Sequence, residues 1–276
     1  MKPFRFGIVA GYSPDLTTWT RQARRVEELG FDTLLVTDPV AGSDPFVLLG
    51  AAAAVTERIR LGSFVLADPF RDHRSLDWQA QTLHKQTGGR FELGIGVGRP
   101  GAEGLATELG REFAPVGERI SRLAETISYV KRTIDRPRLL LGASGPKMLA
   151  LAAREADIVT FSWRANTTET EARSIVDRFR SLAGSRIGEI ELRLNLFAVG
   201  DAPDPQVARF AGADVPELLA SGAMTVLPAD PGRAGETLAR WRERLGISYV
   251  TINSGYAEPF AGIMAAVRGA SDLAGG

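Results

Sequence analysis

The stretch FELGIGVGRPG, residues 91–101, decides between two folds. It contains the pattern G-x-G-x-x-G, formed by Gly96, Gly98 and Gly101, at the end of an apolar run. In a dinucleotide-binding domain this pattern follows the first strand, and an acidic residue ends the next strand about 20 positions further on. Here three strand-like runs come first, and Glu118, at about that distance, falls inside a predicted helix. We therefore interpret the stretch as a barrel strand whose glycines serve another ligand.

Other strand-like runs occur along the whole chain, at residues 5–10, 33–38, 59–66, 138–145, 158–163, 191–199 and 247–253. Each is apolar on both faces, as buried parallel strands require, and segments with helical spacing separate them. With the run at 91–98 they make eight βα units, and the composition does not change between them. This pattern predicts one α/β domain over residues 1–276. The predicted fold is a closed (β/α)8 TIM barrel with its functional site at the strand ends. A doubly wound sheet with a fused second domain is the alternative, but no linker is visible.

Composition excludes several classes of function. The 276 residues include 33 Lys and Arg against 33 Asp and Glu, with no basic stripe, so we expect no nucleic-acid partner. There is no cysteine, which excludes disulfides, thiolate metal sites and a cysteine nucleophile, and is typical of a reducing cytoplasm. No window approaches the roughly 18 apolar residues of a membrane span. We expect a cytoplasmic protein with no metal site and no membrane contact.

Three blocks in order, TERIRLG (56–62), GGRFELGIGVG (88–98) and GASGPKML (142–149), resemble the luciferase-like monooxygenase superfamily, specifically its flavin- or deazaflavin-dependent oxidoreductase branch. The resemblance extends over nearly the whole chain. It implies a barrel, usually a homodimer, that binds a planar tricyclic cofactor at the strand ends. It also implies hydride transfer between the deazaflavin coenzyme F420 and a small-molecule substrate. An FMN-dependent monooxygenase that activates O₂ is the first alternative, and a catalytically degenerate flavin-binding barrel is the second.

The resemblance also implies cofactor-binding residues in two segments. GASGPK (142–147) joins a strand to a helix N-terminus, which attracts anions, and relatives hold the phosphate-bearing cofactor tail there; a tight turn that needs glycine is the alternative reading. The residues in this segment are Ala143, Ser144, Gly145, Pro146 and Lys147. In the third strand, the resemblance places a non-proline cis peptide at Phe64–Val65, after Ser63, against the back of the cofactor ring.

Three residues are candidates for proton transfer, in falling order Asp38, His73 and Glu103. Asp38 ends the second strand, where it either contacts the ring or acts as the acid, or caps the loop. Many relatives have His after this Asp, whereas this chain has Pro39. His73 has an ordinary pKa near 6.5, which suits proton transfer, although a histidine capping a surface helix would look the same.

The remaining candidates would surround the cofactor. Gly98 ends the fourth strand and keeps its end narrow, and the guanidinium of Arg99 would stabilise negative charge on a reduced cofactor. Phe161 and Trp163 end the sixth strand, where they either form a wall of the pocket or pack in the core. Relatives carry a further segment before the fifth strand, where this chain has only RTIDRPR (132–138), so we expect a more open site.

Overall fold

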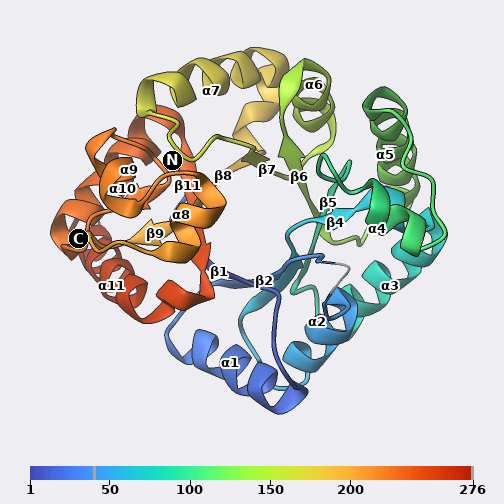
Figure 1. Ribbon diagram of the computed structural model, residues 1–276, viewed down its shortest axis with the longest axis horizontal. Coiled ribbons are helices and arrows are strands. Elements are labelled where there is room, and N and C mark those ends of the chain that lie inside the picture. Colours follow the sequence, from blue (N-terminus) through green and yellow to red (C-terminus); the bar gives the residue numbers. More distant parts are fainter. Residues whose placement is uncertain (40–41, 275–276) are drawn as a thin grey trace.

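The computed structural model describes residues 1–39 and 42–274, and in this part of the chain eight parallel strands close into a barrel (Figure 1). The barrel strands are β1 (Arg5–Ala10), β2 (Thr33–Val36), β3 (Arg60–Ser63) with its continuation β4 (Leu66–Ala67), β5 (Phe91–Gly96), β6 (Arg138–Ala143), β7 (Ile158–Phe161), β8 (Glu191–Leu196) and β11 (Ile247–Asn253). β1 pairs with both β2 and β11, and β3 pairs with β5. The predicted barrel is confirmed, and the doubly wound alternative is wrong because the sheet closes.

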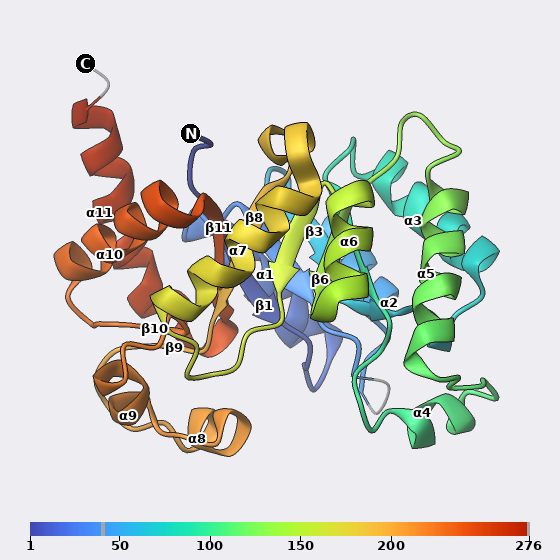
Figure 2. The same cartoon turned by 90° about the horizontal axis from the view of Figure 1, so that it is seen from above.

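Helices cover the outside of the barrel. They are α1 (Leu16–Glu28), α2 (Pro45–Ala53), α3 (His73–Gln86), α5 (Val116–Val130), α6 (Gly145–Glu155), α7 (Glu169–Ala183), α10 (Pro231–Leu245) and α11 (Ala257–Ala274). The short helix α4 (Glu103–Glu108) lies in the connection after β5, on the side of the carboxyl ends of the strands (Figure 2). Each long helix turns one apolar stripe inward; in α1, for example, Trp19, Ala23 and Val26 are buried. Outward-facing strand residues such as Phe6 and Ile8 pack with these stripes in the main core. None of the described helices is both long and apolar enough to span a membrane.

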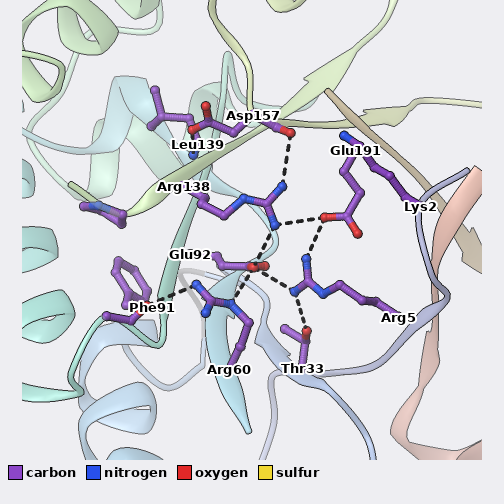
Figure 3. Close-up of polar contacts among 12 residues, drawn as sticks. Lys2, Arg5, Thr33, Arg60, Phe91, Glu92, Arg138, Leu139, Asp157 and Glu191 are labelled. Atoms are coloured by element: carbon purple, nitrogen blue, oxygen red, sulfur yellow. Dashed lines mark hydrogen bonds and ion pairs between the residues drawn. The ribbon is translucent and has the colours of Figure 1, made fainter. Parts of the chain in front are cut away.

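The inner face of the barrel is less apolar than the sequence interpretation assumed. Arg5 points inward from β1 and donates hydrogen bonds to Glu92 of β5 at 2.7 Å and to Glu191 of β8 at 2.6 Å (Figure 3). Arg60 and Arg138 reach the same two carboxylates. The prediction of strands apolar on both faces is therefore wrong for this end, because buried charges are tolerated when they pair with one another. The network fills the N-terminal end of the barrel.

A small lobe extends beyond the carboxyl ends of the strands (Figure 2). It consists of β9 (Ala198–Val199), α8 (Pro205–Ala211), α9 (Val215–Ala220) and β10 (Val226–Leu227), and β9 pairs with β10. Val207, Val215 and Leu218 form an apolar cluster of its own. The sequence predicted helical material here but not the second sheet.

Candidate functional site

A cavity of about 870 Å³ opens at the carboxyl ends of the barrel strands, beneath the lobe. We call it the strand-end cavity. Its lining residues are Val9, Thr37, Phe64, Asn195, Leu196, Phe197, Asp204, Gln206, Val207, Arg209, Asn253, Gly255 and Tyr256. The size is typical of small-molecule and cofactor sites, and the place is where barrel enzymes carry their chemistry. The cavity is therefore our candidate active site.

Phe64 forms part of the wall of the strand-end cavity and begins a cis peptide bond with Val65, as the resemblance implied. The strand bulges there. Gly62 pairs with Glu92 and Leu66 pairs with Ile95, so three residues of one strand lie opposite two of β5. Bulges commonly re-aim a side chain next to an active site, and this one interrupts the third barrel strand at the cavity.

Ser63 is fully buried behind this bulge. Its hydroxyl donates to the carbonyl oxygen of Gly94 at 2.8 Å and accepts from the Gly94 N–H at 2.9 Å. A Cβ at position 94 would lie 1.9 Å from the Ser63 carbonyl oxygen, so this close approach requires glycine. The structure therefore places Ser63 as a support for Phe64 and Val65, with its hydroxyl already engaged.

Seven polar residues of the cavity wall were missed in the sequence: Thr37, Asn195, Asp204, Gln206, Arg209, Asn253 and Tyr256. The Tyr256 hydroxyl donates a hydrogen bond to Asp204. Partial burial, and then the neighbouring carboxylate, raise the pKa of Tyr256, while the hydrogen bond from the Tyr256 hydroxyl is the main cause that lowers the pKa of Asp204. The available signal was that Asn195 and Asn253 are polar residues close to the carboxyl ends of their strands, β8 and β11.

The Asp38 side chain is only 4% exposed and is fully engaged by its neighbours. Its two carboxylate oxygens accept hydrogen bonds from Arg71 at 2.6 and 2.8 Å, and one also accepts from the Ala67 N–H at 2.9 Å. Such bidentate charge-assisted pairs are strong and directional. These contacts favour the interpretation that Asp38 holds the following loop in place.

The structure does not bring His73 or Glu103 to the strand-end cavity. His73 packs edge-on against Tyr129 of α5, with ring centroids 5.0 Å apart, and lines a separate surface groove between α3 and α5. Glu103 is exposed in the first turn of α4. Their roles in proton transfer therefore stay predictions.

Gly98 adopts a left-handed conformation with φ +78°, and a Cβ there would lie 2.9 Å from the Phe113 ring. Arg119 donates to the carbonyl oxygen of Gly98 at 3.2 Å, which fixes the turn. Arg99 follows with an exposed side chain. The opening glycine pattern is therefore a strand-to-helix connection held by packing and by one arginine.

The segment from Ala143 to Lys147 runs from the last residue of β6 into the first turn of α6. Ala143 is buried, whereas Ser144, Gly145, Pro146 and Lys147 are exposed. Ser144 occupies the capping position, yet its side chain makes no capping hydrogen bond, and Gly145 has φ +68°. The N-terminus of α6 thus presents backbone N–H groups and a lysine to solvent, which together favour an anion.

Phe161 ends β7 and Trp163 follows it, and the two rings stack on each other with centroids 5.5 Å apart. Phe161 is 7% exposed and also meets Phe179 edge-on, so it packs in the core. Trp163 is half-buried and lines a smaller pocket of about 390 Å³ beside the lobe. Phe161 therefore lies in the core, and Trp163, stacked on it, lies at the surface pocket.

Comparison with known proteins is informative once this geometry is known. The sequence profile of the family described as luciferase-like monooxygenase matches residues 2–270. An F420-dependent glucose-6-phosphate dehydrogenase of Nakamurella multipartita is 31% identical over 233 residues, which cover 70% of this chain and 67% of that protein. Matches to three further F420-dependent glucose-6-phosphate dehydrogenases span only 35–51% of their lengths.

Many solved structures share the fold, and two of them illustrate it. An F420-dependent secondary alcohol dehydrogenase in complex with an F420–acetone adduct has a TM-score of 0.75 and 17% identity, covering 96% of this chain and 99% of that one. A riboflavin lyase with modified FMN and riboflavin has a TM-score of 0.78 and 14% identity, covering 98% and 92%. At such identities the likeness establishes the barrel architecture alone.

Proposed function

The chain belongs to the luciferase-like monooxygenase family, and from this premise we propose that it is an oxidoreductase that transfers hydride between coenzyme F420 and a small organic substrate. The observation that carries the proposal is the strand-end cavity, with Phe64 of the cis peptide in its wall. The F420-dependent relative that aligns over 70% of this chain supports the choice of cofactor. The reacting bond is a C=C or C=N, or an alcohol and its carbonyl.

The residues present fit such a cofactor. The strand-end cavity is large enough for a flat ring system, and Phe64 offers it an aromatic face. The exposed N-terminus of α6 and Lys147 offer donors and positive charge for an anionic tail. When bound, the cofactor would supply the redox chemistry, while the protein orients it and moves a proton. We retain Ser144, Gly145 and Lys147 as proposed tail contacts.

Proton transfer is best served by Asp204 and Tyr256. Both line the strand-end cavity, and the phenol already donates to the carboxylate. If an alcohol is oxidised, Asp204 can accept its proton through the Tyr256 hydroxyl, and the reverse reaction returns it. Asp38 is committed to Arg71, so we propose that it anchors the loop after β2 and that the acid–base role belongs to this pair.

Cofactor titration tests the proposal. Purified protein is mixed with F420 or with FMN, and quenching of cofactor fluorescence is measured. We expect F420 to bind much more tightly than FMN, and Lys147→Gln to weaken F420 binding several-fold, most strongly at low salt. Lys85→Gln is the matched control because Lys85 is an exposed lysine in the last turn of α3. Tight binding of FMN alone would favour the monooxygenase, and no binding of either would favour a degenerate barrel.

Other features of the protein remain proposals of the same kind. We propose a single domain, a cytoplasmic location, no nucleic-acid partner and a homodimer. The dimer is supported by two large apolar side chains on neighbouring helices: Val47 of α2 is 57% exposed, and Trp78 of α3 is 76% exposed. Sedimentation velocity would test the oligomeric state, and a monomer at micromolar concentration would refute it.

A further inference from the structure

A buried arginine lies inside the barrel below the strand-end cavity. Because side chains alternate along a strand, Glu191, Arg193 and Asn195 of β8 point to the barrel interior in succession. Glu191 belongs to the charge network at the N-terminal end, and Asn195 lines the cavity. Arg193 lies between them and is 1% exposed. It is one of the largest fully buried side chains in the described part of the protein.

Arg193 differs from the other interior arginines in its partners. Arg5, Arg60 and Arg138 all pair with Glu92 or Glu191 (Figure 3). Among the residues that the structure describes, Arg193 has neutral hydrogen-bond acceptors instead, Thr160, Asn195 and Thr251, and its Nε makes no hydrogen bond. A buried cation without a contacting carboxylate is expensive in free energy. Such a charge calls for a functional explanation.

Other groups act on this guanidinium as well, among them Tyr249, whose ring centroid lies 5.4 Å from the guanidinium carbon. Burial is the main cause that lowers the pKa of Arg193, to about 10, so the side chain remains protonated at neutral pH. Glu92 of β5 and Tyr249 of β11 act to raise it, and Arg5 of β1 acts to lower it. Positive charge therefore persists beneath the cavity.

Arg193 touches two residues of the cavity wall. Its guanidinium carbon lies 3.6 Å from the centroid of the Phe64 ring, a close cation–π contact. Its Nη2 donates to Asn195 Oδ1 at 3.4 Å, and Thr251 donates to the same oxygen at 2.8 Å. Because arginine and this hydroxyl both donate, the amide oxygen of Asn195 must face them. The amide NH₂ of Asn195 then donates to the carbonyl oxygen of Leu196 at 3.3 Å, and its second hydrogen is left for a ligand in the cavity.

We propose that Arg193 is a specificity-determining positioning residue that makes the strand-end cavity prefer ring systems in their anionic form. Arg193 does so in two ways: it holds Phe64 and Asn195 in place, and it puts a buried positive charge beneath them. This inference rests on the proposed function, since it assumes that a ring cofactor occupies the cavity. A charge acts strongly on a neighbouring ionisation where water is excluded. Hydride addition to a heteroaromatic ring leaves negative charge on it, which the same guanidinium would stabilise.

The test measures ionisation of the bound ring, which does not depend on turnover. F420 and FMN each carry an acidic proton on the ring, and its loss changes the visible absorbance. We would titrate each ligand between pH 5 and 10, free and bound, with wild type, Arg193→Met and Arg193→Lys. Arg209→Gln is the matched control, because Arg209 lines the cavity but is exposed to solvent.

In wild type we expect the pKa of the bound ring to fall by about one unit, equivalent to roughly tenfold tighter binding of the anion. Arg193→Met should abolish this shift, and Arg209→Gln should preserve most of it. Arg193→Lys should retain the shift while binding both ionisation states more weakly, because lysine lacks the planar contact with Phe64. If Arg193→Met does not fold, as judged by circular dichroism, the lysine variant still decides: loss of the shift overturns the role of charge.

The outcomes separate this inference from the proposed function. Binding by wild type with an unshifted ring pKa, or a shift that survives Arg193→Met, would overturn the role of Arg193 and leave the oxidoreductase proposal intact. Failure of wild type to bind either ring would overturn the proposed function, and the inference with it.

Discussion

Replacement of Asp38 by asparagine separates an anchor from a catalytic acid. The carboxylate accepts three hydrogen bonds, two from Arg71 and one from the Ala67 N–H, and its side chain is 4% exposed. Asparagine keeps one oxygen acceptor and turns an NH₂ group toward a guanidinium, so Arg71 loses its counter-charge while it is mostly buried. Removal of one partner from a buried pair costs about 3–5 kcal/mol. We expect the low end, about 3 kcal/mol, because Arg71 retains some access to water.

Urea unfolding followed by tryptophan fluorescence measures this loss as a lower midpoint at an unchanged slope. Asp177→Asn is the matched control. That residue forms an exposed ion pair with Arg180, and its loss should change the free energy of unfolding by less than about 1 kcal/mol. Adding Arg71→Gln to Asp38→Asn should cost less than the sum of the single changes, because the residues are coupled. A stable Asp38→Asn protein whose turnover falls a hundredfold would refute the anchoring argument and restore Asp38 as the acid.

Three further predictions concern packing, pH and proton transfer. Gly94→Ala should lower the free energy of unfolding by about 3 kcal/mol or more, measured in urea, because the added Cβ would meet the backbone oxygen of Ser63 at 1.9 Å; a loss below 1 kcal/mol would contradict this. Burial alone would raise the pKa of Asp157, but hydrogen bonds, notably from Arg136, outweigh it and lower the pKa below 3.8. The ionised carboxylate therefore stabilises the folded protein above pH 3.8, and this stabilisation is lost as the pH falls through the lower pKa of the folded state. Asp157→Asn should therefore destabilise at pH 7 and much less at pH 2; an equal effect at both would exclude ionisation as the cause. Tyr256→Phe should reduce turnover at least tenfold and alter its pH profile, with cofactor binding little changed; wild-type kinetics would remove the phenol from the mechanism.

The barrel could be predicted because its signal is repeated. Each of the eight strand-like runs coincides with a barrel strand, and strongly periodic segments of this kind are the most readable part of a sequence. The break between β3 and β4 at Phe64–Val65 was predicted only through the family resemblance. Composition alone would have made residues 59–66 an uninterrupted strand.

The lobe and the cavity wall were harder to predict. β9 and β10 have two residues each, too few to show a period, and they pair across 26 residues of intervening chain. Asp204 and Tyr256 are 52 positions apart and meet only because the lobe folds back over η3 (Ser254–Tyr256). Such contacts depend on which strand ends face one another, and a single sequence does not contain that information. The predicted roles of Asp38, His73 and Glu103 remain predictions, although their positions favour another proton-transfer pair.

The charged interior explains why the cavity opens at one end. Glu92 is fully buried and accepts from Arg5 and Arg60, while Glu191 accepts from Arg5 and Arg138, so the N-terminal end of the barrel is filled by ion pairs. Two carboxylates meet three guanidinium groups there, and water still reaches part of each arginine. Higher in the same interior, the hydrogen-bond partners of Arg193 within residues 1–39 and 42–274 are neutral. The closed end therefore holds arginines that pair with carboxylates, whereas a guanidinium without a contacting carboxylate lies beneath the open end, and a ligand entering from the strand ends would meet that charge through the Phe64 ring.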